Sequence, residues 1–279
     1  MTARYLVVAL GVAGVASTAC ARFPFAHSAP SAPAVRPASR AAQDDVDLLT
    51  APPAGLASPD DAVVRVVGPQ MTCSGTLIDE DLVLTAHHCV VERDARGGFT
   101  PKLVSAAAVQ VELGGDFLPW GNVGLRAILA PSCGEAGAKG DIAVLVLERK
   151  LVGMATIGVT DEAPRAGEGV YPQGFGRCAL SAEGIRRRER EGGTITAVSA
   201  GTFEAQASIC PGDSGGPVLD SRTHEVVGVV SLSAMDHDET TRARSVFARV
   251  DQAPKLVAYA RLVADGADPA DMPDLSCDR

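Results

Sequence analysis

The sequence predicts an all-β protein, either an antiparallel barrel or a sandwich, and three observations carry this prediction. Short apolar runs rich in Val recur from residue 62 onward, and Gly, Pro and Asp separate them. The 29 Gly and 18 Pro residues suit many turns between short strands. Helical apolar spacing occurs in one segment, near the end of the chain. We expect strands at residues 63–67, 82–85, 104–113, 123–129, 142–147, 169–175, 194–199, 226–232 and 245–250.

The expected helix follows the last strand. Leu256, Ala260 and Val263 fall on one helical face, so this face should pack against the barrel or sandwich. Asp251 precedes the helix and can cap its free amides.

Composition and charge exclude several classes of protein. The chain has 279 residues, of which 46% are hydrophobic and 21% charged, as in a globular protein with a buried core. Its net charge is −9, so it has no general attraction to nucleic acids or anionic lipid headgroups. Aromatic residues make up 4%, which argues against a surface that stacks bases. We therefore expect no nucleic-acid partner.

The first residues have the pattern of an export signal. The almost wholly apolar run at 5–16 is too short to span a bilayer, so residues 1–19 are typical of a cleaved signal peptide; an uncleaved anchor is the alternative. Residues 16–20, Ala-Ser-Thr-Ala-Cys, resemble a bacterial lipobox, in which lipid is attached to the Cys, here Cys20. Ser17 departs from that pattern, because a branched aliphatic residue is usual there. The alternative is an ordinary signal peptide that leaves Cys20 free.

The cysteine count agrees with export. Of the seven Cys residues, six remain if lipid occupies Cys20, and an even set in an oxidising compartment suggests disulfides. Residues 20–61 are rich in Ala, Pro and Ser, which predicts an extended tether or pro-segment. The expected location is an outer-membrane lipoprotein, or else the periplasm or the medium.

Residues 186–190 form the densest charge run of the chain, Arg-Arg-Arg-Glu-Arg. In an acidic protein such a run is expected to be a solvated surface loop. The alternative is an exposed site of proteolytic nicking.

Three short segments contain the residue types of nucleophilic catalysis. They are Thr-Ala-His-His-Cys at 85–89, Gly-Asp-Ile-Ala at 140–143, and Cys-Pro-Gly-Asp-Ser-Gly-Gly-Pro at 210–217. A serine hydroxyl needs a base to take its proton, and a neutral imidazole held by a carboxylate supplies one. The glycines let the backbone come close to a ligand on both sides of the Ser, where amides can stabilise an oxyanion.

These segments, in the order His, Asp, Ser, resemble the chymotrypsin/trypsin-like serine proteases, in a bacterial exported member. The resemblance covers residues 62–265 and includes Cys-Ser-Gly-Thr-Leu-Ile at 73–78, Gly-Phe-Gly at 174–176 and Ser-Val-Phe-Ala-Arg-Val at 245–250. It implies a protease domain at 62–265 with two six-stranded antiparallel β-barrels and a C-terminal helix, and leaves 266–279 as a tail. It also implies a peptide or protein substrate.

The resemblance assigns catalytic roles residue by residue. Cys89 directly follows the catalytic His in the family, so His88 is the general base, while His87 stands where a small residue is usual and is expected to be structural. Asp141 orients His88, and Ser214 is the nucleophile. The amides of Gly212 and Ser214 are expected to form the oxyanion hole.

The resemblance also places the specificity pocket, at Ser208, Ser233 and Ser245, and a substrate-pairing strand at 230–233 that includes Ser231. A Ser in place of the Asp of trypsin-like members predicts cleavage after small or medium uncharged residues. The rival is a basic preference restored by an acidic residue of the following loop, Asp236, Asp238 or Glu239.

Disulfide pairing follows the resemblance in part. Cys73–Cys89 matches a family disulfide beside the catalytic His. The four other cysteines allow three pairings, from which we predict Cys178–Cys210 and Cys133–Cys277.

The chain departs from the family at its N-terminus. No Ile-Val-Gly-Gly-like sequence precedes Val63, although Asp213, which such an N-terminus pairs with, is present. One explanation is that a cut between residues 36 and 61 frees an atypical N-terminus. The other is that an internal cation, for which we name Arg177, pairs with Asp213. Asp213 needs a partner in either case, because a buried unpaired carboxylate would be costly.

The predicted function is a serine endopeptidase that works through an acyl-enzyme. The alternative is a non-catalytic homologue that acts as a surface-binding module. An α/β-hydrolase esterase is disfavoured, because its His comes last in the chain. His87, His88 and Cys89 lack the spacing of a zinc site, so we expect no metal and no cofactor. We expect a monomer that is attached to the membrane only through its lipid.

Overall fold

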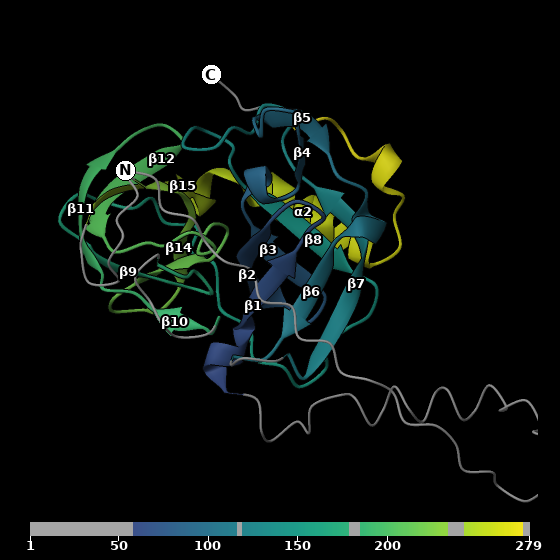
Figure 1. The fold of residues 1–279 in the computed structure, drawn as a ribbon, viewed down its shortest axis with the longest axis horizontal. Coiled ribbons are helices and arrows are strands. Elements are labelled where there is room, and N and C mark those ends of the chain that lie inside the picture. The colour runs from purple at the N-terminus through teal and green to yellow at the C-terminus, as the bar shows by residue number, and fades with distance from the viewer. Residues whose placement is uncertain (1–57, 116–118, 179–184, 234–242, 276–279) are drawn as a thin grey trace, which may run out of the picture.

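The computed structural model describes residues 58–115, 119–178, 185–233 and 243–275. These residues form two antiparallel β-barrels, which lie side by side (Figure 1), with a helix behind the first barrel. The predicted all-β class and the two-barrel architecture are confirmed. Among the described residues, no helix is both long and apolar enough to cross a bilayer.

The first barrel closes in the order β1-β2-β3-β8-β7-β6. Its strands are β1 (Val63–Val67), β2 (Thr72–Asp79), β3 (Leu82–Thr85), β6 (Gln110–Leu113), β7 (Gly121–Leu129) and β8 (Ala143–Leu147). Leu77, Val83 and Leu145 are opposed across β2, β3 and β8 on one face of the sheet, and all three are fully buried. The predicted strand at 104–113 is shorter than expected, because Ala106–Ala108 form a 3-10 turn before β6. Three successive Ala residues offer little of the β-branched bulk that favours a strand.

The second barrel closes because β9 pairs with both β11 and β13. Its strands, in spatial order, are β9 (Gly169–Gly174), β11 (Gly193–Val198), β12 (Thr202–Ala207), β15 (Ala243–Arg249), β14 (Val226–Ser233) and β13 (Pro217–Asp220). The rings of Phe203 and Phe247 pack at 5.1 Å in its core. A short strand, β10 (Arg188–Glu189), pairs with the end of β9.

A two-stranded hairpin stands outside both barrels. It consists of β4 (Val91–Arg93) and β5 (Phe99–Leu103) and directly follows the His87–Cys89 turn. The sequence did not predict this hairpin, because its strands are short and mostly polar or half-exposed. Its position matters because Phe99 projects beside His88.

The helix α2 (Pro254–Ala264) links the last strand of the second barrel to the first barrel. As predicted, Leu256, Ala260 and Val263 are buried, and they belong to the core of the first barrel. The predicted cap is wrong. Ala253 occupies the N-cap position, while Asp251 lies in the preceding 3-10 turn and pairs with Arg249 at 2.6 Å.

Candidate active site

The three predicted catalytic residues come from both barrels. His88 lies in the 3-10 turn that follows β3, and Asp141 lies just before β8, so neighbouring strands of the first barrel present both. Ser214 lies in the loop before β13 of the second barrel. The candidate site therefore forms where the two barrels meet.

His88 and Asp141 are joined by two hydrogen bonds. The His88 Nδ1 is 2.8 Å from Asp141 Oδ2, and the His88 backbone amide donates to Oδ1 at 2.9 Å. Both residues are buried, with 3% and 0% of their surface exposed. With Nδ1 donating to the carboxylate, Nε2 is left as the basic nitrogen of the ring.

A third group holds Asp141 from the second barrel. The buried Ser231 hydroxyl donates to Asp141 Oδ2 and accepts the amide of Gly137 at 2.7 Å. Burial alone would raise the pKa of Asp141. The bonds and the charge from His88, with the Ser231 hydroxyl, outweigh burial and hold that pKa below its usual value. Sequence reasoning gave Ser231 a role on the substrate strand and missed this contact, for which the sequence carries no local signal.

The loop that carries Ser214 is fixed to β2. The Ser74 amide donates to the Ser214 carbonyl at 2.8 Å, and the Ser74 hydroxyl donates to the Gly212 carbonyl at 2.8 Å. Ser74 follows Cys73, whose disulfide leads to Cys89 beside His88. The hydrogen bonds of the described residues do not include one between Ser214 Oγ and His88, a contact that often forms only with substrate.

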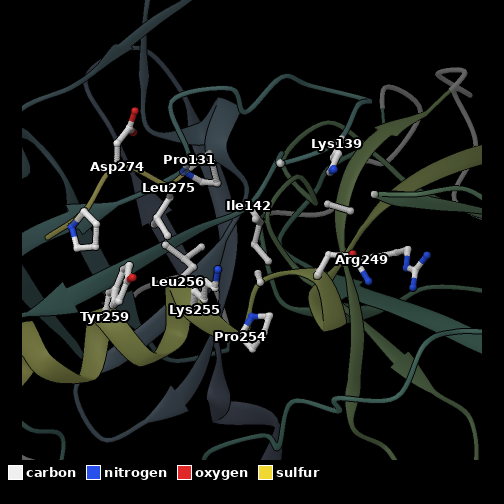
Figure 2. A pocket seen from close by; sticks show the side chains of 16 residues that line it. Pro131, Lys139, Ile142, Arg249, Pro254, Lys255, Leu256, Tyr259, Asp274 and Leu275 are labelled. Atoms are coloured by element: carbon white, nitrogen blue, oxygen red, sulfur yellow. The ribbon is translucent and has the colours of Figure 1, made fainter. Parts of the chain in front are cut away.

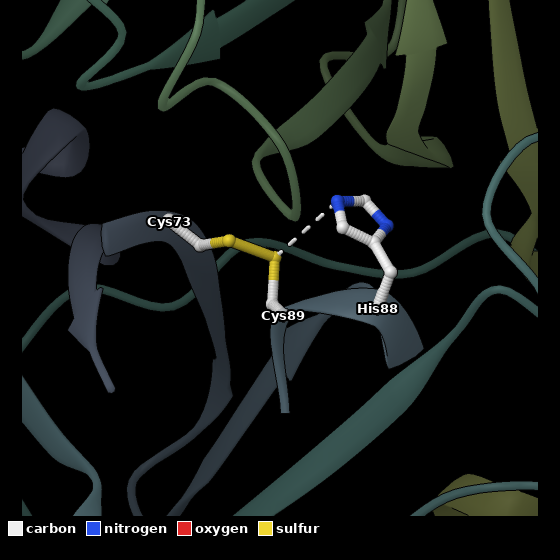
Figure 3. Close-up of side chains that lie close together, drawn as sticks. All are labelled: Cys73, His88 and Cys89. Atoms are coloured by element: carbon white, nitrogen blue, oxygen red, sulfur yellow. Dashed lines mark hydrogen bonds between the residues drawn. A yellow bond between two sulfur atoms is a disulfide. The ribbon is translucent and has the colours of Figure 1, made fainter. Parts of the chain in front are cut away.

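Figure 3 shows the His88 ring beside this disulfide, with Nε2 at 3.8 Å from the Cys89 sulfur. Cys73, His88 and Cys89 are close enough to resemble a metal cluster. Both sulfurs are bonded to each other, however, and a zinc-binding Cys must be a free thiolate. The cluster therefore offers one imidazole and no thiolate.

The backbone amides of the Ser214 loop differ in whether they donate a hydrogen bond. Gly212 has φ +103°, in the left-handed region that favours glycine. The amides of Asp213, Gly215 and Gly216 all donate to backbone carbonyls. No hydrogen bond among the described residues has the Gly212 or Ser214 amide as its donor, so these two N–H groups are available to a ligand.

The partner of Asp213 is Arg190, not Arg177 as we predicted. Arg190 Nε is 2.8 Å from Asp213 Oδ2, and the guanidinium also contacts Oδ1 at 3.2 Å. The Arg177 side chain is exposed instead. The expectation of a solvated loop at 186–190 is thus wrong for Arg190, which is buried. It directly follows β10, and its amide continues the pairing with β9 by donating to the Pro172 carbonyl at 2.8 Å.

Two of the three predicted pocket residues are described in full. Ser208 and Ser245 are buried, and the Ser245 hydroxyl donates to the Ala207 carbonyl at 3.2 Å. The backbones of Ser233 and Ser245 pair between β14 and β15, which brings these positions together. The side chain of Ser233 lies outside the described residues. The same holds for Asp236, Asp238 and Glu239.

The structure contains the predicted Cys73–Cys89 and Cys178–Cys210 disulfides. The second joins the segment after β9 to the Ser214 loop, close to Asp213. The predicted Cys133–Cys277 pair falls partly outside the described residues, because Cys277 is not among them. Cys20 is not described either.

Two cavities lie near Asp141. One, of about 400 Å³, is lined by Gly140, Ile142 and the start of α2, and it holds none of the three predicted catalytic residues (Figure 2). The other, of about 480 Å³, is lined by His87, His88 and Phe99. The second cavity opens beside the proposed base, so it belongs to the candidate active site.

Comparison with known proteins agrees with this geometry. No curated protein matches the chain by sequence. Among solved structures, the mouse serine protease neuropsin has a TM-score of 0.56 at 15% identity, over 73% of this chain and 96% of its own. A Glu endopeptidase has a TM-score of 0.56 at 17% identity, over 75% of this chain and 93% of its own. Both show a shared fold. Residues 54–257, more than half of the chain, match the family model described as Trypsin, and the protein therefore belongs to the trypsin family of serine-type endopeptidases.

Proposed function

We propose that Ser214, His88 and Asp141 hydrolyse a peptide bond through an acyl-enzyme. Ser214 Oγ attacks the peptide carbonyl, and its proton passes to His88 Nε2 as the C–O bond forms. The same proton then goes to the leaving amine as the C–N bond breaks. Water repeats the sequence on the ester and restores the hydroxyl. The observation that carries this proposal is the paired contact of Asp141 with the ring and the amide of His88.

The Gly212 and Ser214 amides are proposed to stabilise the oxyanion of each tetrahedral intermediate. Neither amide donates to another described residue, so binding the oxyanion would sacrifice no existing contact. Removing one such donor from an enzyme of this type costs about 10²–10³ in kcat.

Activation is proposed to need no new N-terminus. The Arg190 guanidinium already neutralises Asp213, and the amides of Cys210 and Gly176 donate to the same carboxylate at 2.8 and 2.7 Å. These contacts support a Ser214 loop that is in place in the uncut chain.

Substrate and location complete the proposal. The site is proposed to take peptides as an added strand on β14 and to cleave after small or medium uncharged residues, since buried Ser208 and Ser245 carry no charge. The protein is proposed to act as an exported monomer that is held to a membrane through lipid on Cys20.

A fluorophosphonate probe tests the proposal against the alternative of a non-catalytic binding module. The probe should label the wild-type protein at Ser214 and leave Ser214→Ala unlabelled, because covalent reaction requires an activated hydroxyl. A folded wild-type protein that takes up no label and cleaves no peptide would favour the binding module.

A further inference from the structure

A buried hydroxyl joins the first barrel to two loops of the second. Ser74 of β2 is 0% exposed, and its hydroxyl donates to the Gly212 carbonyl at 2.8 Å. The same hydroxyl accepts the amide of Phe175, the residue after β9, at 2.8 Å. A carbonyl only accepts and an amide only donates, so the hydroxyl proton is directed at Gly212. A side chain of the first barrel therefore holds the Gly212 carbonyl.

This carbonyl belongs to the peptide group that lies between the two proposed oxyanion donors. The Gly212 N–H is part of the peptide group after Pro211, and the Ser214 N–H is part of the one after Asp213. The peptide group of Gly212 and Asp213 connects these two, so its orientation sets the angle between the two N–H groups. Gly212 has φ +103° and no Cβ, which leaves this connection little steric restraint of its own.

The two outer peptide groups are held in a different way from the middle one. Backbone amides of the second barrel donate to their carbonyls, from Arg177 to Pro211 at 2.9 Å and from Gly216 to Asp213 at 2.9 Å. The N–H of the middle group, which is that of Asp213, donates to the Cys210 carbonyl at 3.0 Å and so stays inside the loop. Among the described residues, the Ser74 hydroxyl is the contact that ties the middle group to the rest of the protein.

We propose that Ser74 is a positioning residue for oxyanion binding, whose hydroxyl keeps the Gly212 and Ser214 N–H groups aligned on one oxygen. The inference rests on the proposed function of the same site. Without the hydroxyl the buried Gly212 carbonyl loses this partner, and rotation of its peptide group toward another would turn the two N–H groups apart. Such a loss of alignment weakens the oxyanion contacts, which form in the transition state, and leaves binding of the substrate unchanged.

The test compares Ser74→Ala with Thr76→Val in the cleavage of one peptide. Thr76 lies on the same strand and is equally buried, and its hydroxyl has no hydrogen-bond partner in the described part of the chain, so it supplies the matched control. Ser74→Ala should lower kcat by about tenfold to a hundredfold, less than the loss of a whole oxyanion donor, and leave KM within about twofold. Thr76→Val should equal the wild type in both constants.

A transition-state analogue distinguishes positioning from a general loss of structure. When a peptide trifluoromethyl ketone binds, Ser214 Oγ adds to its carbonyl carbon, the proton passes to His88, and the carbonyl oxygen becomes an oxyanion. In Ser74→Ala the inhibition constant of this ketone should rise by the factor by which kcat/KM falls. The inhibition constant of the corresponding peptide alcohol, which forms no oxyanion, should stay the same.

A second pair of variants guards against loss of folding. Ser74→Thr and Ser74→Val add nearly the same bulk and differ in the hydroxyl, so Ser74→Thr should retain the higher kcat. All rates are divided by the number of sites that a fluorophosphonate labels to completion, so that unfolded protein is not counted.

Three results would overturn the positioning role while Ser214 still labels. They are equal kcat in Ser74→Ala and Thr76→Val, an unchanged inhibition constant of the ketone in Ser74→Ala, and equal kcat in Ser74→Thr and Ser74→Val. A wild-type protein that neither labels nor cleaves would instead overturn the proposed function, and this inference with it.

Discussion

Arg190 and Asp213 form a buried, two-contact ion pair directly beside the proposed nucleophile. The two side chains have 2% and 0% of their surface exposed. The pair also makes further hydrogen bonds, because the guanidinium donates to the Gly176 carbonyl and the carboxylate accepts two backbone amides. A buried ion pair is tolerated when its remaining donors and acceptors are satisfied in this way.

Replacing Arg190 should therefore be severely damaging. Arg190→Met leaves the Asp213 carboxylate buried without a cation, and we expect a loss of about 3–5 kcal/mol in the free energy of unfolding, with loss of peptidase activity. Urea unfolding measures this change in the free energy of unfolding, and a Ser214→Ala background prevents self-cleavage during the measurement. Arg177→Met, at an exposed position three residues after Gly174, is the control and should change little.

The double variant Arg190→Met/Asp213→Asn should recover part of the lost stability, because no charge then remains buried and unpaired. Activity that appears only after a cut before Val63 would contradict the proposal that Arg190 replaces a new N-terminus.

This pair shows how far the sequence alone could go. The Gly-Asp-Ser-Gly segment predicted that Asp213 needs a cation, which follows from the cost of burying a charge. The choice between Arg177 and Arg190 depends on tertiary structure, because Arg190 is brought to Asp213 by the pairing of β10 with β9 just before it. A two-residue strand of charged residues has no apolar alternation by which to recognise it.

The proposed triad predicts losses of activity that differ between Ser214, His88 and His87. Ser214→Ala should lower kcat by about 10⁶, and His88→Ala by about as much, because the residues of a triad act as a unit. His87→Ala should cost far less, since His87 makes no hydrogen bond to Asp141 among the described residues, whereas His88 makes two. Steady-state cleavage of one peptide by the three variants checks this. A tolerated His88→Ala with an inactive His87→Ala would reverse the assignment.

His87 should make stability depend on pH. Its pKa is lowered in the folded protein, mainly by burial, so on acidification the unfolded chain takes up a proton before the folded one does. The contribution to stability is complete above pH ~6.5, the ordinary His value, and falls as the pH drops below it, by at most about 1.4 kcal/mol per pH unit.

Urea unfolding between pH 7.5 and 5 compares Ser214→Ala with Ser214→Ala/His87→Gln, whose side chain does not titrate in this range. The first protein should lose stability more steeply on acidification. Asp141 is common to both proteins, and its lowered pKa acts at more acidic pH, so it cancels in the difference. Parallel curves would show that His87 does not have the lowered pKa.

Strands of the second barrel illustrate a second limit of the sequence. β12 (Thr202–Ala207) alternates between buried and partly exposed residues, yet its buried positions are Phe203, Ala205 and Ala207. Two Ala residues give a weak apolar alternation, so the strand escaped prediction. The position of Ser231 on β14 was predicted from the family pattern, whereas its bond to Asp141 arises only when the two barrels meet.

Membrane attachment is expected to depend on Cys20. Several acyl chains anchor a protein stably, so the wild-type protein should fractionate with membranes. In a Gram-negative host it should fractionate with the outer membrane, because Ala21, and not an Asp, follows Cys20. Cys20→Ser should release it. A membrane-bound Cys20→Ser protein would remove the lipid hypothesis, and intact-mass measurement of the wild type would show directly whether lipid is present.

Ser208 should decide the residue after which the protein cuts. It is fully buried, and the hydroxyl of buried Ser245 donates to the carbonyl of the preceding residue, Ala207, so the described part of the predicted pocket is small, polar and uncharged. We expect a peptide-library profile dominated by small or medium uncharged residues at the cleaved position. Ser208→Asp should shift cleavage toward Arg and Lys, because a buried carboxylate gains a partner only when a basic side chain enters. In the free enzyme the unpaired Asp should lower the free energy of unfolding. Ser208→Asn is a neutral control of similar size and should lower it less.

Dominant cleavage after Arg or Lys by the wild-type protein would contradict the predicted role of Ser208, and it would direct attention to Asp236, Asp238 and Glu239 as the source of the negative charge.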